Sequence, residues 1–231
     1  MQLTRTLPDR VIDWFEERLR IRGVIEYLIN EPMPTGARTL YLGGVTLFFF
    51  IVQAITGMLL VIYYRPTPEA AYESILLIMN QVRFGWLIRS LHAWSANLMI
   101  LACIGHMLRV YFQGAYKKPR ELTWMVGVLL LAVTLVFGFT GYLLPWDQTA
   151  YWASTVGTEI AGAIPLVGEP MLNVLRAGND ITGMTLSRFF GIHVLILPAT
   201  ILALLAAHIL LIHQIGLFDP THRWMGPHQD H

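Results

Sequence analysis

Four long apolar segments constrain this chain more than any other feature. They cover about residues 40–64, 87–111, 122–144 and 189–212. Each is long enough to cross the hydrocarbon core of a bilayer as a helix. Hydrophobic residues make up 55% of the chain and charged residues 13%, which does not suit a surface facing water. Because lipid cannot satisfy an open backbone, we expect an all-α fold, a transmembrane up-down four-helix bundle.

The segments outside the spans divide the chain into three parts. Residues 1–39 form an N-terminal amphipathic surface segment, residues 40–213 the membrane domain, and residues 214–231 a polar tail. Within the membrane domain, residues 69–81 have the apolar spacing of a short interfacial helix. The connection over 147–188 is long, and connections of that length are usually functional.

Lysine and arginine are distributed unevenly about the spans. The basic residues on the side of the termini are Arg5, Arg10, Arg18, Arg20, Arg22, Arg38, Lys117, Lys118, Arg120 and Arg223; those on the other side are Arg65, Arg83, Arg89, Arg176 and Arg188. The positive-inside rule therefore predicts that both termini are cytoplasmic. We expect a bacterial cell membrane rather than a thylakoid-type membrane. A net charge of +1 gives no basic field for nucleic acid.

Four histidines lie inside the predicted spans: His92 and His106 in the second, His193 and His208 in the fourth. The separations of 14 and 15 residues are nearly whole numbers of helical turns, so each helix presents both imidazoles on about one face, roughly 21–22 Å apart. Spans two and four run parallel in an up-down bundle. His92 is then level with His193, and His106 with His208. Such opposed pairs are typical of the axial ligands of b-type haem in electron transfer.

Glycine repeats the same period on the two intervening spans. Gly43 and Gly57 are 14 residues apart, as are Gly127 and Gly141. Glycine allows a flat macrocycle to approach the backbone closely, although it also packs membrane helices without any ligand. For the histidines, the alternatives are hydrogen-bonded core residues or a proton relay in a transporter.

Three stretches, together with the histidine pairs, resemble the short, split cytochromes b often called cytochrome b6. The stretches are FGWLIRSLH at 84–92, QGAYKKPREL at 113–122 and GFTGYLLPWD at 138–147. The resemblance covers nearly the whole chain from Asp13 to Gly216. It implies a low-potential haem held by His92 and His193 near the positive side of the membrane. It also implies a high-potential haem held by His106 and His208 near the negative side.

The resemblance implies roles for several other residues. Arg89 and Arg109 correspond to partners of the haem propionates, and each lies three residues from a ligand. A snorkelling arginine at a helix end is the alternative for Arg109. The long connection would form one wall of a quinol pocket, through Trp146, Tyr151, Trp152 and Val156.

The implied function is electron transfer in a quinol–cytochrome c or plastocyanin reductase, from quinol oxidised near the positive side to quinone at the negative side. The chain would not be active alone. The family's Pro-Glu-Trp-Tyr motif does not occur in it, so a separate subunit must supply that motif and the remaining helices. The other implied partners are a Rieske iron–sulfur protein and a c-type cytochrome, in a homodimeric complex.

Two positions depart from the family pattern. Tyr41 stands where many split cytochromes b have a cysteine that attaches a third haem, and the sole cysteine, Cys103, lies within a span. We therefore expect no covalently bound third haem. His213 follows His208 by five residues, where split relatives usually have arginine. This spacing is similar to that of the longer cytochromes b of bc1 complexes, whose equivalent histidine contacts quinone. An ordinary interfacial histidine is the alternative.

Two other classes of protein remain possible on the histidine pattern alone. One is the dihaem membrane anchor of a formate dehydrogenase, nitrate reductase or hydrogenase. The other is a haem-free proton-coupled transporter. The KKPREL and LPWD stretches count against the anchor, and the matched spacing of four histidines counts against the transporter.

Overall fold

The computed structural model describes residues 41–178, 180–216 and 218. The predicted N-terminal surface segment and most of the predicted tail lie outside these residues. Every regular element within the described ranges is helical. The predicted all-α class is therefore confirmed for the part of the chain that the structure describes.

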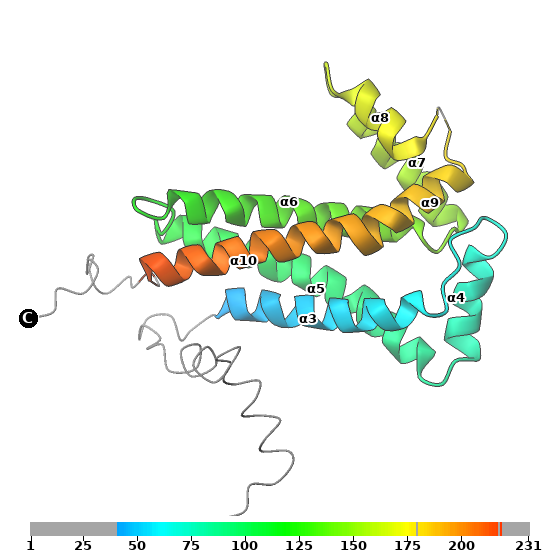
Figure 1. Cartoon of the computed structure of the whole chain (residues 1–231), viewed down its shortest axis with the longest axis horizontal. Helices are drawn as coiled ribbons and strands as arrows, with labels where there is room; N and C mark the ends of the chain where they lie inside the picture. Colours follow the sequence, from blue (N-terminus) through cyan, green and yellow to red (C-terminus); the bar gives the residue numbers. More distant parts are fainter. Residues whose placement is uncertain (1–40, 179, 217, 219–231) are drawn as a thin grey trace, which may run out of the picture.

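Four helical rods are long and apolar enough to cross a membrane. They are α3 (Leu42–Val61), α5 (Gly85–Phe112), α6 (Glu121–Leu143) and a continuous run over Gly183–Ile215. They lie side by side along the long axis of the molecule, with α3 packed on α5 and α6 packed on the fourth rod (Figure 1). The four predicted spans are confirmed, although the fourth rod begins at Gly183, several residues earlier than predicted.

The fourth rod is not a uniform α-helix. It consists of α9 (Gly183–Gly191), a π-helical turn η2 (Ile192–Ile196) and α10 (Leu197–Ile215). The π turn ends two residues before Pro198, which has no N–H to continue the α-helical ladder. Turns of this kind are wider than α-helical turns and occur often at functional sites.

The predicted interfacial helix is α4 (Ala71–Asn80), which lies across one end of the bundle (Figure 1). The chain reverses between α4 and α5 at Phe84, which has a left-handed backbone with φ 60°. Gly85 follows, with its Cα against the Ile78 carbonyl, where any Cβ would clash with the backbone. This close approach fixes where α5 begins.

The long connection is folded into two helices, α7 (Gln148–Gly162) and α8 (Gly168–Arg176). The Asp147 carboxylate caps α7 by accepting a hydrogen bond from the Ala150 N–H at 2.8 Å. The main cluster of buried apolar residues lies at this end of the bundle and consists of Ala71, Leu143, Ile181, Leu186 and Phe189. The core therefore joins α4, α6 and α9 where the connection meets the spans.

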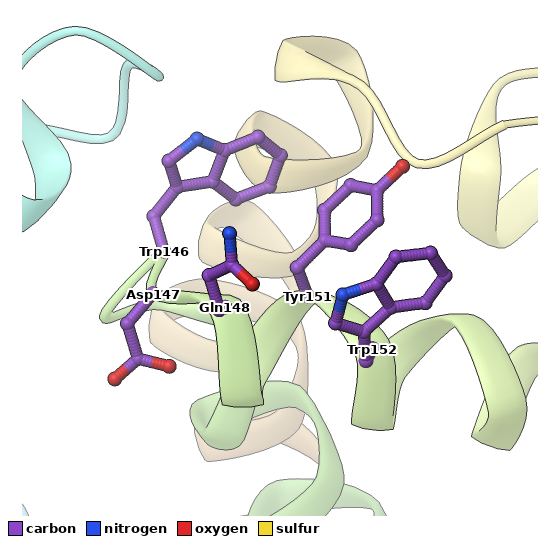
Figure 2. Close-up of a pocket in the computed structure, with 5 residues that line it drawn as sticks. All are labelled: Trp146, Asp147, Gln148, Tyr151 and Trp152. Atoms are coloured by element: carbon purple, nitrogen blue, oxygen red, sulfur yellow. The ribbon is translucent and has the colours of Figure 1, made fainter.

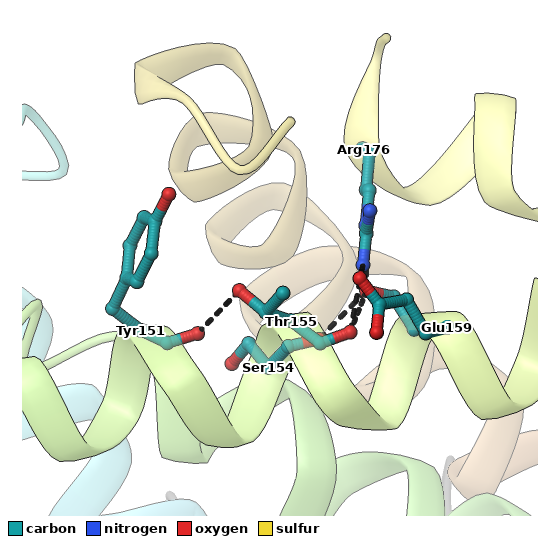
Figure 3. A network of polar contacts seen from close by, with 6 residues as sticks. Tyr151, Ser154, Thr155, Glu159 and Arg176 are labelled. Carbon is teal, nitrogen blue, oxygen red and sulfur yellow. Dashed lines mark hydrogen bonds and ion pairs between the residues drawn. The ribbon is translucent and has the colours of Figure 1, made fainter. Parts of the chain in front are cut away.

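A buried arginine links the helices of the connection (Figure 3). Arg176 is 5% exposed, and its Nε donates a hydrogen bond to the Thr158 hydroxyl at 2.6 Å. A terminal nitrogen of the same guanidinium donates to the Thr155 carbonyl at 2.7 Å, and it lies 3.6 Å from the Glu159 carboxylate. The Arg176 carbonyl accepts from the Thr185 hydroxyl at 2.7 Å. One residue thus connects α7, α8 and α9.

Candidate functional site

The four intramembrane histidines lie at two levels of the bundle. Toward the α4 end, the rings of His92 on α5 and His193 on η2 face each other, with centroids 6.4 Å apart and planes at 71°. Toward the other end, His106 on α5 and His208 on α10 lie within electrostatic range of each other. The structure therefore brings together the two pairs that the spacing predicts.

The distance between His92 and His193 suits a metal between them. An imidazole nitrogen binds a metal at about 2.0–2.1 Å, so two imidazoles that share one metal have ring centroids roughly 6 Å apart. No group of three or more histidine, cysteine or acidic side chains that could hold a metal occurs among the described residues. A pair of imidazoles alone fits a metal whose other four ligands come from a macrocycle, as in haem.

Each histidine rests against one of the four predicted glycines. A Cβ on Gly57 would lie 3.3 Å from His92 Cε1, and one on Gly43 would lie 3.3 Å from His106 Cε1. On the other pair of rods, the corresponding distances are 2.7 Å from Gly141 to His193 and 3.5 Å from Gly127 to His208. Glycine at these positions leaves room for the imidazoles between neighbouring helices.

The π turn explains why the two histidine separations differ by one residue. His92 and His106 lie on the uninterrupted helix α5, whereas His193 belongs to η2. The Leu197 N–H donates to the Ile192 carbonyl, five residues earlier, so this turn takes up about one residue more than an α-helical turn. A separation of 15 residues across it therefore covers nearly the same number of turns as 14 residues on α5.

Several polar groups that contact the histidines were missed from the sequence. The Thr56 hydroxyl lies 2.8 Å from His92 Nδ1, and the Thr140 hydroxyl lies 3.0 Å from His193 Nδ1. Gln53 donates to the His92 carbonyl at 2.6 Å and to the Ser95 hydroxyl at 2.7 Å. Both threonines directly precede a predicted glycine, and that adjacency was the available signal.

The two predicted propionate partners lie near opposite ends of α5. Arg89 is half-buried one turn before His92, and its guanidinium contacts the Met79 sulfur on α4 at 3.8 Å. Arg109 lies in the last turn of α5, within electrostatic range of His106. Arg89 therefore lies near the His92 level, and Arg109 lies near the His106 level.

A pocket of about 330 Å³ lies where α6 gives way to α7, lined by Trp146, Asp147, Gln148, Tyr151 and Trp152. The two indoles flank the Tyr151 phenol, and the Asp147 carboxylate points away from them (Figure 2). Trp146 has a left-handed backbone with φ 54°, a conformation that non-glycine residues seldom adopt. Of the predicted wall residues, Val156 does not line this pocket, although its side chain is exposed on the same helix.

The opposite end of the bundle carries the polar and aromatic residues of the α5–α6 loop. His213 is exposed in the last turn of α10. Close to the end of that helix, the Arg120 guanidinium donates to the Gly216 carbonyl at 3.3 Å and lies over the Phe218 ring at 5.6 Å. Partial burial lowers the pKa of Arg120. Asp219, the expected neighbour of His213, lies outside the described residues.

Fold and site together define a class, the four-span membrane proteins with paired histidines at two depths. The profile of the family described as "Cytochrome b/b6/petB" matches residues 28–216. The chain belongs to this cytochrome b family. It is an integral membrane subunit of an electron-transport oxidoreductase complex, a cytochrome b of the quinol–cytochrome c or plastocyanin reductase type, for which b-type haem is the implied cofactor.

Individual relatives agree with this assignment. The chain is 49% identical over 212 residues to "Cytochrome b6" of Heliobacterium mobile, covering 90% of this chain and all of that protein. It is 46% identical to "Cytochrome b6" of Synechococcus elongatus, over 91% of this chain and 99% of the relative. Among solved structures, "Hyperthermophilic respiratory Complex III" matches with a TM-score of 0.80 and 34% identity, over 91% of this chain and 56% of the matched one.

Proposed function

We propose that this chain holds two b-type haems and carries electrons across the membrane from a quinol oxidation site at its positive side to a quinone reduction site at its negative side. The observation that carries the proposal is the placement of two histidine pairs at two depths, with a glycine against each imidazole. When bound, the haems would supply two one-electron redox centres.

His92 and His193 would hold the haem iron near the positive side, and His106 and His208 would hold the haem iron near the negative side. Gly57 and Gly141 would flank the first site, and Gly43 and Gly127 the second.

Arg89 and Arg109 would each offer a guanidinium to a buried propionate, since a carboxylate in low dielectric needs a charged donor. Tyr41 at the start of α3 offers no thiol, so no third haem would be covalently attached there, and the two b-type haems would be held non-covalently.

The pocket beside Trp146 and Trp152 supports a quinol site at the positive side. Its aromatic side chains suit the flat ring of a quinol, and the Gln148 amide and Tyr151 hydroxyl are polar groups that could orient it. The pocket is half of a site at most, because the Pro-Glu-Trp-Tyr motif would come from the separate subunit. Val156 would then face that subunit or the quinol tail rather than the pocket itself.

At the negative side, His213 would donate a hydrogen bond or a proton to a quinone carbonyl. The remaining partners would be a Rieske iron–sulfur protein and a c-type cytochrome, in a homodimeric complex. We place the complex in a bacterial cell membrane with both termini on the cytoplasmic side. An electron moving against a potential of 100 mV requires about 2.3 kcal/mol, so transfer between the sites must be downhill in redox potential.

The purified complex tests this proposal through haem stoichiometry and a reduced-minus-oxidised spectrum. We expect two b-type haems per chain, both extractable by acidified organic solvent. One haem per chain, or none, would overturn the dihaem assignment. A co-purifying molybdenum or nickel enzyme, in place of a Rieske protein, would instead support a membrane anchor.

A further inference from the structure

The two histidine levels differ in what faces the outer ring nitrogen, Nδ1. At the α4 end, Nδ1 of His92 meets the Thr56 hydroxyl at 2.8 Å, and Nδ1 of His193 meets the Thr140 hydroxyl at 3.0 Å. At the other level, the buried Nδ1 atoms of His106 and His208 have no hydrogen-bond partner among the described residues. The Thr123 backbone lies near the His208 ring, but Nδ1 does not reach hydrogen-bond geometry with it.

The direction of the threonine hydrogen bonds follows from the single proton of a hydroxyl. The Thr56 hydroxyl donates that proton to the Val52 carbonyl at 2.6 Å, and the Thr140 hydroxyl donates to the Val136 carbonyl at 2.9 Å. Each threonine oxygen is then left to accept from the histidine, so Nδ1 carries the ring proton. Nε2 keeps its lone pair, which is the tautomer that a metal requires.

The two histidine levels also differ in the residue that directly precedes each glycine in the sequence. At the α4 end, threonine precedes each glycine, as Thr56 before Gly57 and Thr140 before Gly141. Fourteen residues earlier on the same helices, the equivalent positions are Leu42 and Val126. Neither of these side chains can accept a hydrogen bond. At these two positions, the asymmetry between the levels therefore follows from the residue types at equivalent places on the helices.

We propose that Thr56 and Thr140 are positioning residues that lower the reduction potential of the haem held by His92 and His193 relative to the haem held by His106 and His208. An imidazole that donates from Nδ1 is a more basic ligand and stabilises the more highly charged, oxidised iron. The inference rests on the proposed haem ligation. It supplies a physical reason for electrons to pass from the haem held by His92 and His193 to the haem held by His106 and His208.

Redox titration of the intact complex tests the proposal. We expect Thr56→Val and Thr140→Val each to raise the potential of the positive-side haem, with a larger rise in the double variant. A tenfold change in the reduction equilibrium corresponds to about 59 mV for a one-electron couple, and a shift of that order is expected for the double variant. Thr→Ser at either position keeps the acceptor and should restore the original potential. The negative-side haem serves as the internal reference.

A reciprocal variant adds a hydrogen-bond acceptor at the other level instead of removing one. Val126→Thr places a hydroxyl at the position equivalent to Thr140 and should lower the potential of the haem held by His208, without changing the positive-side haem. The electron paramagnetic resonance spectrum of the oxidised haems should shift at the altered level only, because it reports imidazole orientation.

The outcomes separate this inference from the proposed function. Unchanged potentials in the double valine variant with both haems bound would overturn the role of the threonines and leave the haem ligation standing. An unchanged negative-side potential in Val126→Thr, with the haem in place, would also count against it. Absence of haem from the unmodified complex would instead remove the proposed function itself.

Discussion

Gly141 lies so close to His193 that a Cβ at this position would be 2.7 Å from the imidazole Cε1. Carbon atoms essentially never approach that closely, so any side chain on residue 141 must displace the ring or the helix that carries it. The equivalent distance at Gly57, to His92, is 3.3 Å. The two positions therefore offer a graded test of whether these glycines make room for a ligand.

We expect Gly141→Val to weaken binding of the positive-side haem by about tenfold or more, the size of the loss in affinity seen when groups supporting a metal ligand are altered. Gly57→Ala should be milder and mainly shift the potential. Gly191→Ala is the control, since a Cβ there meets nothing within 4 Å. Haem content, visible spectra and redox titration provide the measurement. Normal haem content, spectra and potentials for both Gly141→Val and Gly57→Ala would show that these glycines have an ordinary packing role.

Replacing single histidines should remove haems by level. His92→Leu and His193→Leu are expected to abolish the same positive-side haem, because the centroids of the two rings lie 6.4 Å apart. His106→Leu and His208→Leu should abolish only the negative-side haem. Redox titration monitored at the α band distinguishes the two centres by potential. Loss of different haems from the His92 and His193 variants would contradict the pairing.

His213→Leu addresses the quinone site at the negative side. The residue is exposed at the end of α10, about 7.5 Å along the helix from His208 and about 140° around it. Leucine can neither hydrogen-bond a quinone carbonyl nor supply a proton. We expect both haems to bind and to be reduced by quinol, while reoxidation of the negative-side haem by quinone slows by about 10²-fold. Stopped-flow spectroscopy measures that step, and wild-type reoxidation would identify His213 as an ordinary interfacial residue.

Arg176→Met is expected to loosen the connection formed by α7 and α8. It removes charged hydrogen bonds to the Thr158 hydroxyl and the Thr155 carbonyl, each worth about 1.5–3 kcal/mol. Glu159→Gln is the matched control, because the Glu159 side chain is 62% exposed and its ion pair contributes about 0–1 kcal/mol. Thermal denaturation and limited proteolysis should show earlier cleavage within residues 144–182 for Arg176→Met. Equal behaviour of the two variants would argue that the buried guanidinium is dispensable.

Local sequence patterns predict the four spans and the two-level arrangement of histidines and glycines. Both are local properties, since a bilayer demands long apolar helices and the rise of a helix converts residue separation into depth. The order of the spans then decides which histidines share a level. The resemblance to cytochrome b6 also rested on local stretches, and the family comparisons confirm it.

The rotation of each helix about its axis depends on packing between helices, and so does the set of side chains that meet there. The hydrogen bonds of Thr56 with His92 and of Thr140 with His193 join residues 36 and 53 positions apart, so no local pattern predicts them. The π turn at His193 becomes visible only when the backbone is traced, and the burial of Arg176 depends on three helices closing around it. These features arise from packing between distant segments, which hydrophobic periodicity does not encode.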